Sequence, residues 1–462
     1  MSPDVGPMPA LVDAYRHSTI DPLRPRDLLA DEVSQRWESG YDVTAVVAEA
    51  NATDADDGPA LLELVDRMAD LERRDDWAFE EPETLADIRA SLPAVPTPTS
   101  GSRAGLADQL HAAWLGRVVG CNVGKPLEWG WHWTAAHIRD YLERAGAYPL
   151  DDYVPVLDPM PAAFVLRENW PETTRGNVNG SARDDDIDYP ILALHLLETY
   201  GRSLRPEHVG EAWTTLFPLR QVYTAERAAY VNLTLGLEPP RTATFRNPYR
   251  EWIGAQIRGD MFGYVHPGDP WAAAELSYAD ASLSHTTNGV YGEMWAAALV
   301  AAAFDASSAL EAVTVSLGVV PPRSRLAAAL RHVLELHADG VTWEQALTEI
   351  QRAYGHHSWV HTINNAAAVV AGLLWHEDQF AAAVGAAVMS GWDTDCNGAT
   401  VGSVAGILAG DPAGLPTRLV EPLHDRTRSA LFGFDNSSIS DLAARTHALA
   451  AGGLARVVPA RG

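Results

Sequence analysis

Apolar residues recur every three or four positions along most of the chain after residue 103, which places them on one face of a helix. The stretches with this spacing are 104–119, 187–200, 307–317, 323–337, 342–354, 362–375, 378–389 and 398–409. Residues 292–304 are apolar nearly all round, which is typical of a helix buried on every side. Alternating strand patterns are scarce. The pattern therefore predicts an all-α fold of many packed helices.

The chain before this body differs in composition and is predicted to form a separate region. Residues 1–92 are expected to be acidic and helical, because Leu61, Leu64 and Met68 repeat at helical spacing. Residues 93–103, which begin PAVPTPTSGS, lack a hydrophobic period and are typical of a linker. Residues 104–462 are predicted to form one compact domain, with 131–180 as long loops over a site.

The net charge of the chain limits the classes of molecule that it is expected to bind. The 462 residues include 61 acidic and 34 basic ones, a net charge of −27, and the first 100 hold 22 acidic residues against 8 arginines. Such a surface repels a phosphate backbone or an anionic membrane, so we expect no nucleic acid and no membrane partner. A cation is a better expectation.

Three further features predict a cytoplasmic protein. The chain has no long uncharged apolar run, and its first residues lack the pattern of a secretory signal. Its two cysteines, Cys121 and Cys396, suit a reducing compartment and are too few for a four-thiolate zinc site.

Two acidic motifs stand near the starts of predicted helices. The first is Arg183-Asp184-Asp185-Asp186-Ile187-Asp188, and the second is Gly391-Trp392-Asp393-Thr394-Asp395-Cys396-Asn397. Consecutive carboxylates repel one another, and a divalent cation compensates that repulsion because hard cations take oxygen ligands. Solvated acidic caps that complement the helix dipole are the alternative. The motifs by themselves leave both interpretations open.

In order and spacing, four segments resemble the motifs of the ADP-ribosylglycohydrolase family, which includes the dinitrogenase reductase-activating glycohydrolases. They are the glycine-rich segment 116–128, the acidic step 184–186, Leu283-Ser284-His285-Thr286, and the turn 393–396. The form Gly-Trp-Asp-Thr-Asp-Cys-Asn is similar to that of one bacterial branch. The resemblance covers roughly residues 104–410 and implies a compact all-helical catalytic domain. The small helical extension predicted from residues 1–92 would precede it.

The resemblance also implies a metal-dependent hydrolase of a glycosidic bond. Family members hold two Mg²⁺ ions between these motifs, beside the ribose hydroxyls of the substrate, and Mn²⁺ is an alternative ion. Two such metals can orient the ribose diol and activate a water. By position, the metal ligands would be Asp184, Asp185, Asp186, Asp393 and Asp395. The catalytic residues would be Glu128, Asp185 and Asp393, with Glu128 near the water or the leaving group.

Two positions depart from the family's pattern. Asp184 and Cys396 stand where the family has threonine. A thiol is a poorer ligand for Mg²⁺ than a hydroxyl, whereas the extra carboxylate adds negative charge. The departures therefore leave open whether two metals bind or one.

Seven residues are predicted to contact the substrate: Asn122, Lys125, Trp129, Asn179, His285, Asn288 and Asn397. Lys125 is the sole lysine and could meet a phosphate. Trp129 begins a tryptophan cluster that could stack on a flat group or only pack. His285 could hold a substrate oxygen or cap the next helix.

For three other positions, the neighbouring residues predict a pKa, a binding partner or a location. The tryptophans that follow Glu128 would raise its pKa and suit proton transfer, although a carboxylate at the rim is the alternative. Glu293 lies on the apolar helix and needs a partner if it is buried. His356-His357 resembles a metal pair, but adjacent helical residues diverge, so a loop or surface position is expected.

The leading hypothesis is a magnesium-dependent hydrolase of a ribosyl, ADP-ribosyl-type, N- or O-glycosidic bond. Its substrate would be a small molecule or an ADP-ribosylated target. One alternative is a hydrolase of a small nucleoside or secondary-metabolite glycoside, and another is a catalytically silent module that binds an ADP-ribose-type ligand. The aglycone, the anomer, the oligomeric state and the role of residues 1–100 are left open.

Overall fold

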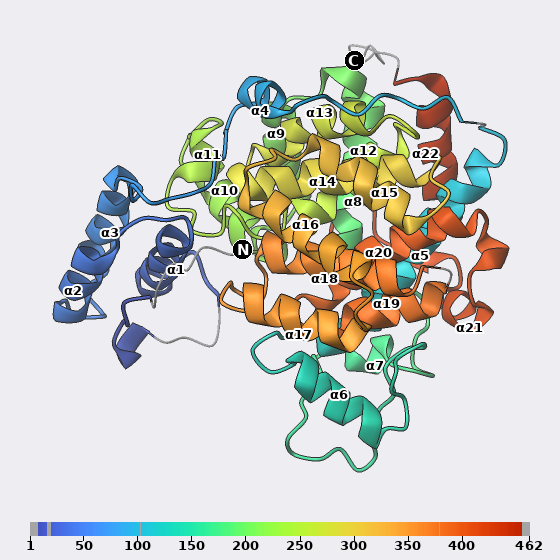
Figure 1. Ribbon diagram of the computed structural model, residues 1–462, viewed down its shortest axis with the longest axis horizontal. Coiled ribbons are helices and arrows are strands. Elements are labelled where there is room, and N and C mark those ends of the chain that lie inside the picture. The colour runs from blue at the N-terminus through green and yellow to red at the C-terminus, as the bar shows by residue number, and fades with distance from the viewer. Residues whose placement is uncertain (1–7, 16–19, 102, 378, 455–462) are drawn as a thin grey trace.

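The computed structural model describes residues 8–15, 20–101, 103–377 and 379–454. These residues form the helices α1 to α22, several 3₁₀ turns and two strands of two residues each (Figure 1). The predicted all-α fold with a small helical N-terminal extension is confirmed.

The N-terminal extension is a small helical unit with its own apolar cluster. It contains α1 (Pro25–Glu38), α2 (Thr44–Ala52) and α3 (Gly58–Arg67), with 3₁₀ turns at Asp13–Tyr15 and Met68–Asp70. Leu29, Val33, Val47 and Leu61 pack together inside it. In Figure 1 these helices stand to the left of the main body.

A connecting segment joins the extension to the body. The short helix α4 (Leu85–Ser91) buries Ile88 in the main core rather than in the extension's cluster. The chain then runs over the outside of the body to α5 (Figure 1). The backbone N–H of Thr99 donates to the carbonyl of Gly268 over 2.8 Å, and Arg103 pairs with Asp305 at 2.8 Å.

The main body is made of the remaining helices. They are α5 (Leu106–Gly124), α6 (Ala135–Arg144), α7 (Trp170–Thr173), α8 (Asp185–Tyr200), α9 (Pro206–Leu216), α10 (Thr224–Thr234), α11 (Arg241–Thr244), α12 (Asp260–Tyr264), α13 (Pro270–Ala281), α14 (Thr287–Ala303), α15 (Ala309–Ser316), α16 (Arg325–Ala338), α17 (Trp343–Tyr354), α18 (Thr362–Trp375), α19 (Phe380–Met389), α20 (Thr394–Ala409), α21 (Thr417–Val420) and α22 (Ile439–Gly452). The strands β1 (Arg426–Thr427) and β2 (Ser437–Ser438) pair antiparallel, with Arg426 opposite Ser438. The predicted long loops of 131–180 are interrupted by α6 and α7.

Helix α14 lies at the centre of the body. Every residue from Thr287 to Ala303 is buried, as its apolar character on all sides predicts. The small alanine side chains let neighbouring helices approach it closely, and α12, α13 and α15 pack against it.

Helices α5 and α20 cross at glycines, and this contact brings two of the motifs together. A Cβ at Gly120 would collide with the carbonyl of Gly398, and one at Gly116 with that of Gly402. Gly124 meets the carbonyl of Thr394 in the same way. The helical spacing of apolar residues predicted that this helix ends at residue 119, and this was wrong. The glycines continue the helix through Gly124, because their role is close packing rather than a turn.

Helix α1 docks on the body through buried polar contacts. Glu32 pairs with Arg250 at 2.7 Å, and Gln35 donates to Glu251 over 2.7 Å. Glu38 lies 2.9 Å from Nδ1 of His357. His356 and His357 lie in the loop after α17, as expected. His357 is not at the surface, however, but buried, because the extension covers it.

The burial of Glu38 makes stability depend on pH. Burial raises the pKa of Glu38 to about 8, and burial lowers the pKa of His357 well below its usual value, so both side chains are neutral in the folded protein at pH 7. The pKa of Glu38 is about 8 in the folded protein and has its ordinary value of 4.5 in the unfolded chain. Protonation of Glu38 therefore stabilises the fold fully below pH 4.5, and this stabilisation is lost as the pH rises to about 8.

We therefore expect Glu38→Gln to match the wild type at pH 5 and to exceed its free energy of unfolding at pH 9. Each pKa unit between the folded and unfolded states corresponds to about 1.4 kcal/mol. Urea unfolding at both pH values measures the difference, with the exposed Glu63→Gln as a control that should show none. An equal effect of Glu38→Gln at both pH values would contradict this account.

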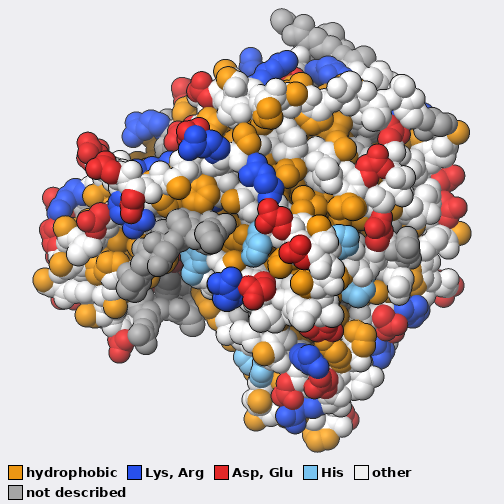
Figure 2. Space-filling model, viewed as in Figure 1, with side chains coloured by type: hydrophobic (Ala, Val, Ile, Leu, Met, Phe, Trp, Pro, Cys, Tyr) orange, Lys and Arg blue, Asp and Glu red, His pale blue; other side chains and the backbone are white. Residues whose placement is uncertain are grey.

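The charged side chains on the surface do not point to a particular binding partner. Figure 2 shows acidic and basic side chains interspersed over the face seen in Figure 1. In the part of the chain that the structure describes, none of the helices is both long and apolar enough to cross a bilayer.

Candidate metal centre and its cavity

The first acidic motif opens helix α8. Asp184 is its N-cap, and a carboxylate oxygen of Asp184 accepts from the backbone N–H of Asp186 at 2.9 Å. Asp186 is fully buried. Three acidic side chains thus lie at the positive end of the helix dipole, which lowers the cost of holding them together.

Arg117 on α5 holds the first acidic motif in place. Its guanidinium lies 3.2 Å from a carboxylate oxygen of Asp186 and 2.8 Å from Asp260, and it also donates to the backbone carbonyl of Asp186 over 2.7 Å. Arg117 and both aspartates are fully buried. The arginine therefore fixes the position of Asp186 from the side that faces the core.

The second motif opens helix α20. Asp393 is its N-cap and follows Trp392, whose φ of +60° places it in the left-handed region. Asn365 on α18 holds this turn, because its side-chain oxygen accepts from the N–H of Asp393 at 3.1 Å and from the amide of Asn397 at 2.7 Å. Asp395 lies in the first turn, so its carboxylate faces α5 and α8.

Lys125 stands between the two motifs. Its ammonium group lies 2.8 Å from Asp395 and 2.6 Å from Glu128, and it also contacts Asp184. Burial by itself would lower the pKa of Lys125, but these carboxylates outweigh it and hold the pKa well above its usual value. The sole lysine of the chain is therefore charged and partly neutralises the cluster.

Two carboxylate oxygens point away from Lys125. Within the described residues, Oδ2 of Asp186 and Oδ1 of Asp395 are buried and accept no hydrogen bond. Ligand atoms of Asp184, Asp186, Asp395 and Cys121 lie within 4.8 Å of one another. Burial and the neighbouring carboxylate of Asp184 raise the pKa of Asp186 well above its usual range. Free oxygens that lie this close, with excess negative charge around them, fit a divalent cation.

A second group of ligand atoms belongs to Asp393, Asp395 and Cys396. Burial, and then the charge of Asp395, raise the pKa of Asp393 well above its usual range. Asp395 is shared between both groups, so it can bridge two cations. Asp185 lies beside Asp184, and its pKa is raised by burial and by that neighbour.

Both cysteines lie in this centre, which the sequence reasoning recognised only for Cys396. Cys121 belongs to the first group and Cys396 to the second, and both are free and buried. The signal for Cys121 was its place within the glycine-rich motif, one helical turn before Lys125. Burial raises the pKa of both thiols well above the usual value, so they are protonated in the absence of a metal.

Glu128 lies at the edge of the cluster. Burial, and then the charge of Asp395, raise its pKa to about 7, while Lys125 and Arg167 lower it. Arg167 approaches it to 3.5 Å. A carboxyl group whose pKa lies near neutrality can both donate and accept a proton, which suits general acid–base catalysis.

The cluster opens into one cavity of about 280 Å³. Six of the residues predicted from the sequence line it: Lys125, Glu128, Trp129, Asp185, Asp393 and Asp395. Its remaining wall combines apolar residues, among them Trp131, Ile253, Trp359 and Val360, with three charged ones, Arg167, Glu226 and Arg227. The lining thus offers both carboxylates and a group of aromatic and aliphatic side chains.

Four of the predicted substrate contacts lie behind the cavity instead of in its wall. The side chain of Asn122 binds Ser181 at 2.8 Å and the N–H of Ala182 at 3.2 Å, which holds the segment ahead of the first motif. His285 is buried beside Ser284, and burial lowers its pKa well below the usual value. The amides of Asn288 and Asn397 are bound by Glu251 and by Asn365, respectively.

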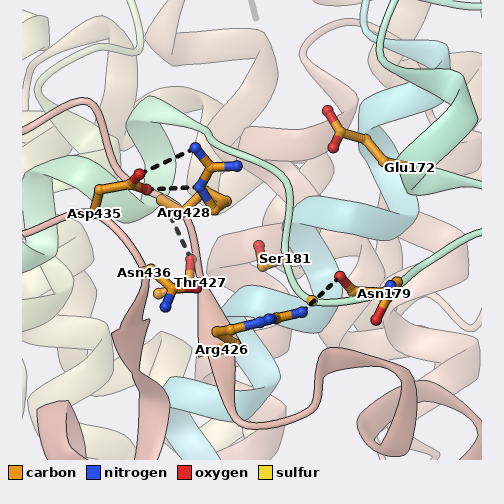
Figure 3. A pocket seen from close by; sticks show the side chains of 9 residues that line it. Glu172, Asn179, Ser181, Arg426, Thr427, Arg428, Asp435 and Asn436 are labelled. Carbon is orange, nitrogen blue, oxygen red and sulfur yellow. Dashed lines mark hydrogen bonds and ion pairs between the residues drawn. The ribbon is translucent and has the colours of Figure 1, made fainter.

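Asn179 lines a different pocket. Figure 3 shows this pocket, of about 300 Å³, where Arg426 donates to the backbone carbonyl of Asn179 and Arg428 pairs with Asp435. Glu293 lies far inside α14 and has Arg258 at 3.4 Å as the charged partner that its burial requires.

Comparison with known proteins places the chain in one family. A sequence model described as ADP-ribosylglycohydrolase matches residues 102–453, which include all four motifs and nearly all of the cavity. No curated protein matches the chain. A solved structure described as an ADP-ribosylglycohydrolase-related protein complex is similar at 19% identity and a TM-score of 0.45, over 75% of this chain and 99% of that chain. The chain therefore belongs to the ADP-ribosylglycohydrolase family and is a hydrolase of glycosidic bonds.

Proposed function

We propose that the protein is a magnesium-dependent hydrolase of a ribosyl, ADP-ribosyl-type, N- or O-glycosidic bond. The observation that carries this proposal is a pair of buried ligand groups that share Asp395, one with Asp184 and Asp186 and the other with Asp393. Oxygens of Asp186 and Asp395 are left free. Glu128 faces the same cavity. The family's action on ADP-ribosylated substrates supports the choice of sugar, and a cytoplasmic location remains part of the proposal.

Each side chain of the centre would have its own role in such a reaction. Bound Mg²⁺ would supply Lewis acidity and orient the ribose hydroxyls. Asp184, Asp186 and Asp395 would hold the first ion, and Asp393 with Asp395 the second. Glu128 would take a proton from the attacking water or give one to the leaving atom, since its pKa of about 7 permits both. Lys125 would keep the carboxylates from repelling one another.

Cys396 is expected to weaken the second ion's site. A protonated thiol is a poor ligand for Mg²⁺, whereas a threonine hydroxyl is a hard one. We expect Cys396→Thr to bind Mg²⁺ about tenfold more tightly and Cd²⁺ more weakly, in a calorimetric titration of chelator-treated protein. Cys396→Ala removes the thiol without adding a hydroxyl, so it should lower the affinity for Cd²⁺ and leave that for Mg²⁺ unchanged. Equal Mg²⁺ affinity of Cys396→Thr and the wild type would show that this position is not a ligand.

A direct test of the function uses ADP-ribosyl-arginine as the substrate. The proposal expects release of ADP-ribose that requires Mg²⁺ or Mn²⁺ and stops when the metal is chelated. A second candidate function, hydrolysis of a small nucleoside, is favoured by the apolar wall of the cavity. Adenosine hydrolysis in place of ADP-ribosyl-arginine hydrolysis would identify that candidate instead.

A further inference from the structure

The N-terminal extension reaches the cavity, although the family match begins only at residue 102. Ile20, five residues before α1, lines the same cavity as Glu128 and Asp393. Ile20 also packs against the main core, whereas Leu29, Val33 and the other apolar residues of the extension form a separate cluster. Its side chain is therefore placed by the cavity wall rather than by the extension's own interior.

The wall beside Ile20 is formed by two turn segments that a single β-bridge joins. The backbone N–H of Ile253 donates to the carbonyl of Val360 over 2.8 Å, and Trp252 bridges His361 in antiparallel register. Ile253, Trp359 and Val360 from this pair line the cavity. The position of these three side chains depends on what holds the paired segments.

Helix α1 supports both segments from outside. Arg250 and Glu251, just before Ile253, are bound by Glu32 and Gln35 at 2.7 Å each. On the other segment, His357 lies two residues before Trp359 and is bound by Glu38 at 2.9 Å. All of these polar partners are buried. The contacts between extension and body thus lie directly behind the cavity wall.

The aromatic and aliphatic side chains of the cavity, which is also lined by Arg167, Glu226 and Arg227, suit a flat, uncharged ring. Trp131 and Trp359 stand edge to face with their ring centres 6.0 Å apart, and Trp131 is 48% exposed, so it has surface free to cover a ligand. Trp129, Ile253, Ile257 and Val360 line the same cavity. Aromatic and aliphatic surfaces gain most by covering a planar group that carries no charge.

We propose that the N-terminal extension completes the substrate cavity, and that Ile20 with Trp131 and Trp359 selects glycosides whose aglycone is a flat, uncharged ring. This inference rests on the proposed function, since it assumes that the sugar binds at the carboxylates of the same cavity. Ile20 is then a specificity-determining residue supplied from outside the family domain.

The test compares binding of adenosine, which carries such a ring on its ribose, with binding of ribose alone. Quenching of tryptophan fluorescence within the first second, in the presence of Mg²⁺, gives both affinities before turnover matters. We expect Ile20→Ala to weaken adenosine binding about five- to tenfold and to leave ribose binding unchanged, because the substitution removes the apolar contact of the carbons beyond Cβ. Ile20→Leu should retain the wild-type affinity.

Leu23→Ala provides the matched control. Leu23 lies on the same segment and is 53% exposed, so shortening it should change neither affinity. The inference is overturned if Ile20→Ala binds adenosine as tightly as the wild type, or if adenosine binds no more tightly than ribose. The double variant Asp393→Ala with Asp395→Ala distinguishes a failure of this inference from a failure of the proposed function. If that variant keeps the wild-type affinity for ribose in Mg²⁺, the proposed function itself fails.

Discussion

Asp393→Ala combined with Asp395→Ala is expected to lower turnover by at least about a thousandfold. The two carboxylates supply the second group of ligand atoms, and Asp395 also belongs to the first. A loss of about 4 kcal/mol of transition-state stabilisation corresponds to about that factor. The measurement is the rate on whichever of ADP-ribosyl-arginine and adenosine the wild type hydrolyses.

The same double variant should fold. Burial and mutual repulsion raise the pKa of Asp393 well above its usual range, so removing the pair relieves an unfavourable interaction in metal-free protein. We therefore expect its free energy of unfolding without metal to equal or exceed that of the wild type. The control removes two exposed aspartates outside the cavity, with Asp140→Ala and Asp151→Ala, and should keep full activity. Full turnover in the site variant would refute the assignment.

Arg117→Met is expected to produce the largest loss of stability, about 3–5 kcal/mol. The guanidinium is fully buried and is the partner of Asp186 and Asp260, as well as a donor to the carbonyl of Ile257. Methionine preserves much of the volume but leaves two buried carboxylates without their counter-charge. Urea unfolding of metal-free protein measures the loss.

Two further variants define the cause of that loss. Arg139→Met removes an exposed arginine that pairs with Glu143 one helical turn away, and it should change stability by no more than about 0.5 kcal/mol. Arg117→Met with Asp260→Asn should recover part of the stability, because one of the unpaired charges is gone. No recovery in the double variant would indicate that packing, rather than charge, explains the effect.

The sequence predicted the helices of the body and the acidic centre because both have local signals. Helical spacing of apolar residues marked α16, α17 and α18 within about two residues of their observed bounds. The acidic motifs were visible because carboxylates at such density are costly without compensation. The pKa of Glu128 is raised, as its tryptophan neighbours led us to expect. Burial is the largest cause, and the charge of Asp395 is the second.

What the sequence did not reveal depends on contacts between distant residues. The glycines of α5 indicate a turn when taken alone, and only the opposing glycines of α20 explain why they are helical. His357 resembles a surface residue until the extension is placed over it. Ile20 has no local signal at all, because its significance comes from the cavity it meets. The substrate roles of Asn122, Asn179, His285, Asn288 and Asn397 remain predictions.

The most direct test of the central claim is the stability of chelator-treated protein as Mg²⁺ is added, compared between the wild type and the Asp393→Ala, Asp395→Ala variant. Ligand at a hundredfold excess over its dissociation constant stabilises the folded state by about 2.7 kcal/mol. We predict that Mg²⁺ stabilises the wild type by such an amount, that ADP-ribose adds to the effect, and that the variant shows neither gain. Equal stabilisation of both proteins by Mg²⁺ would contradict the account, since the ion would then bind elsewhere.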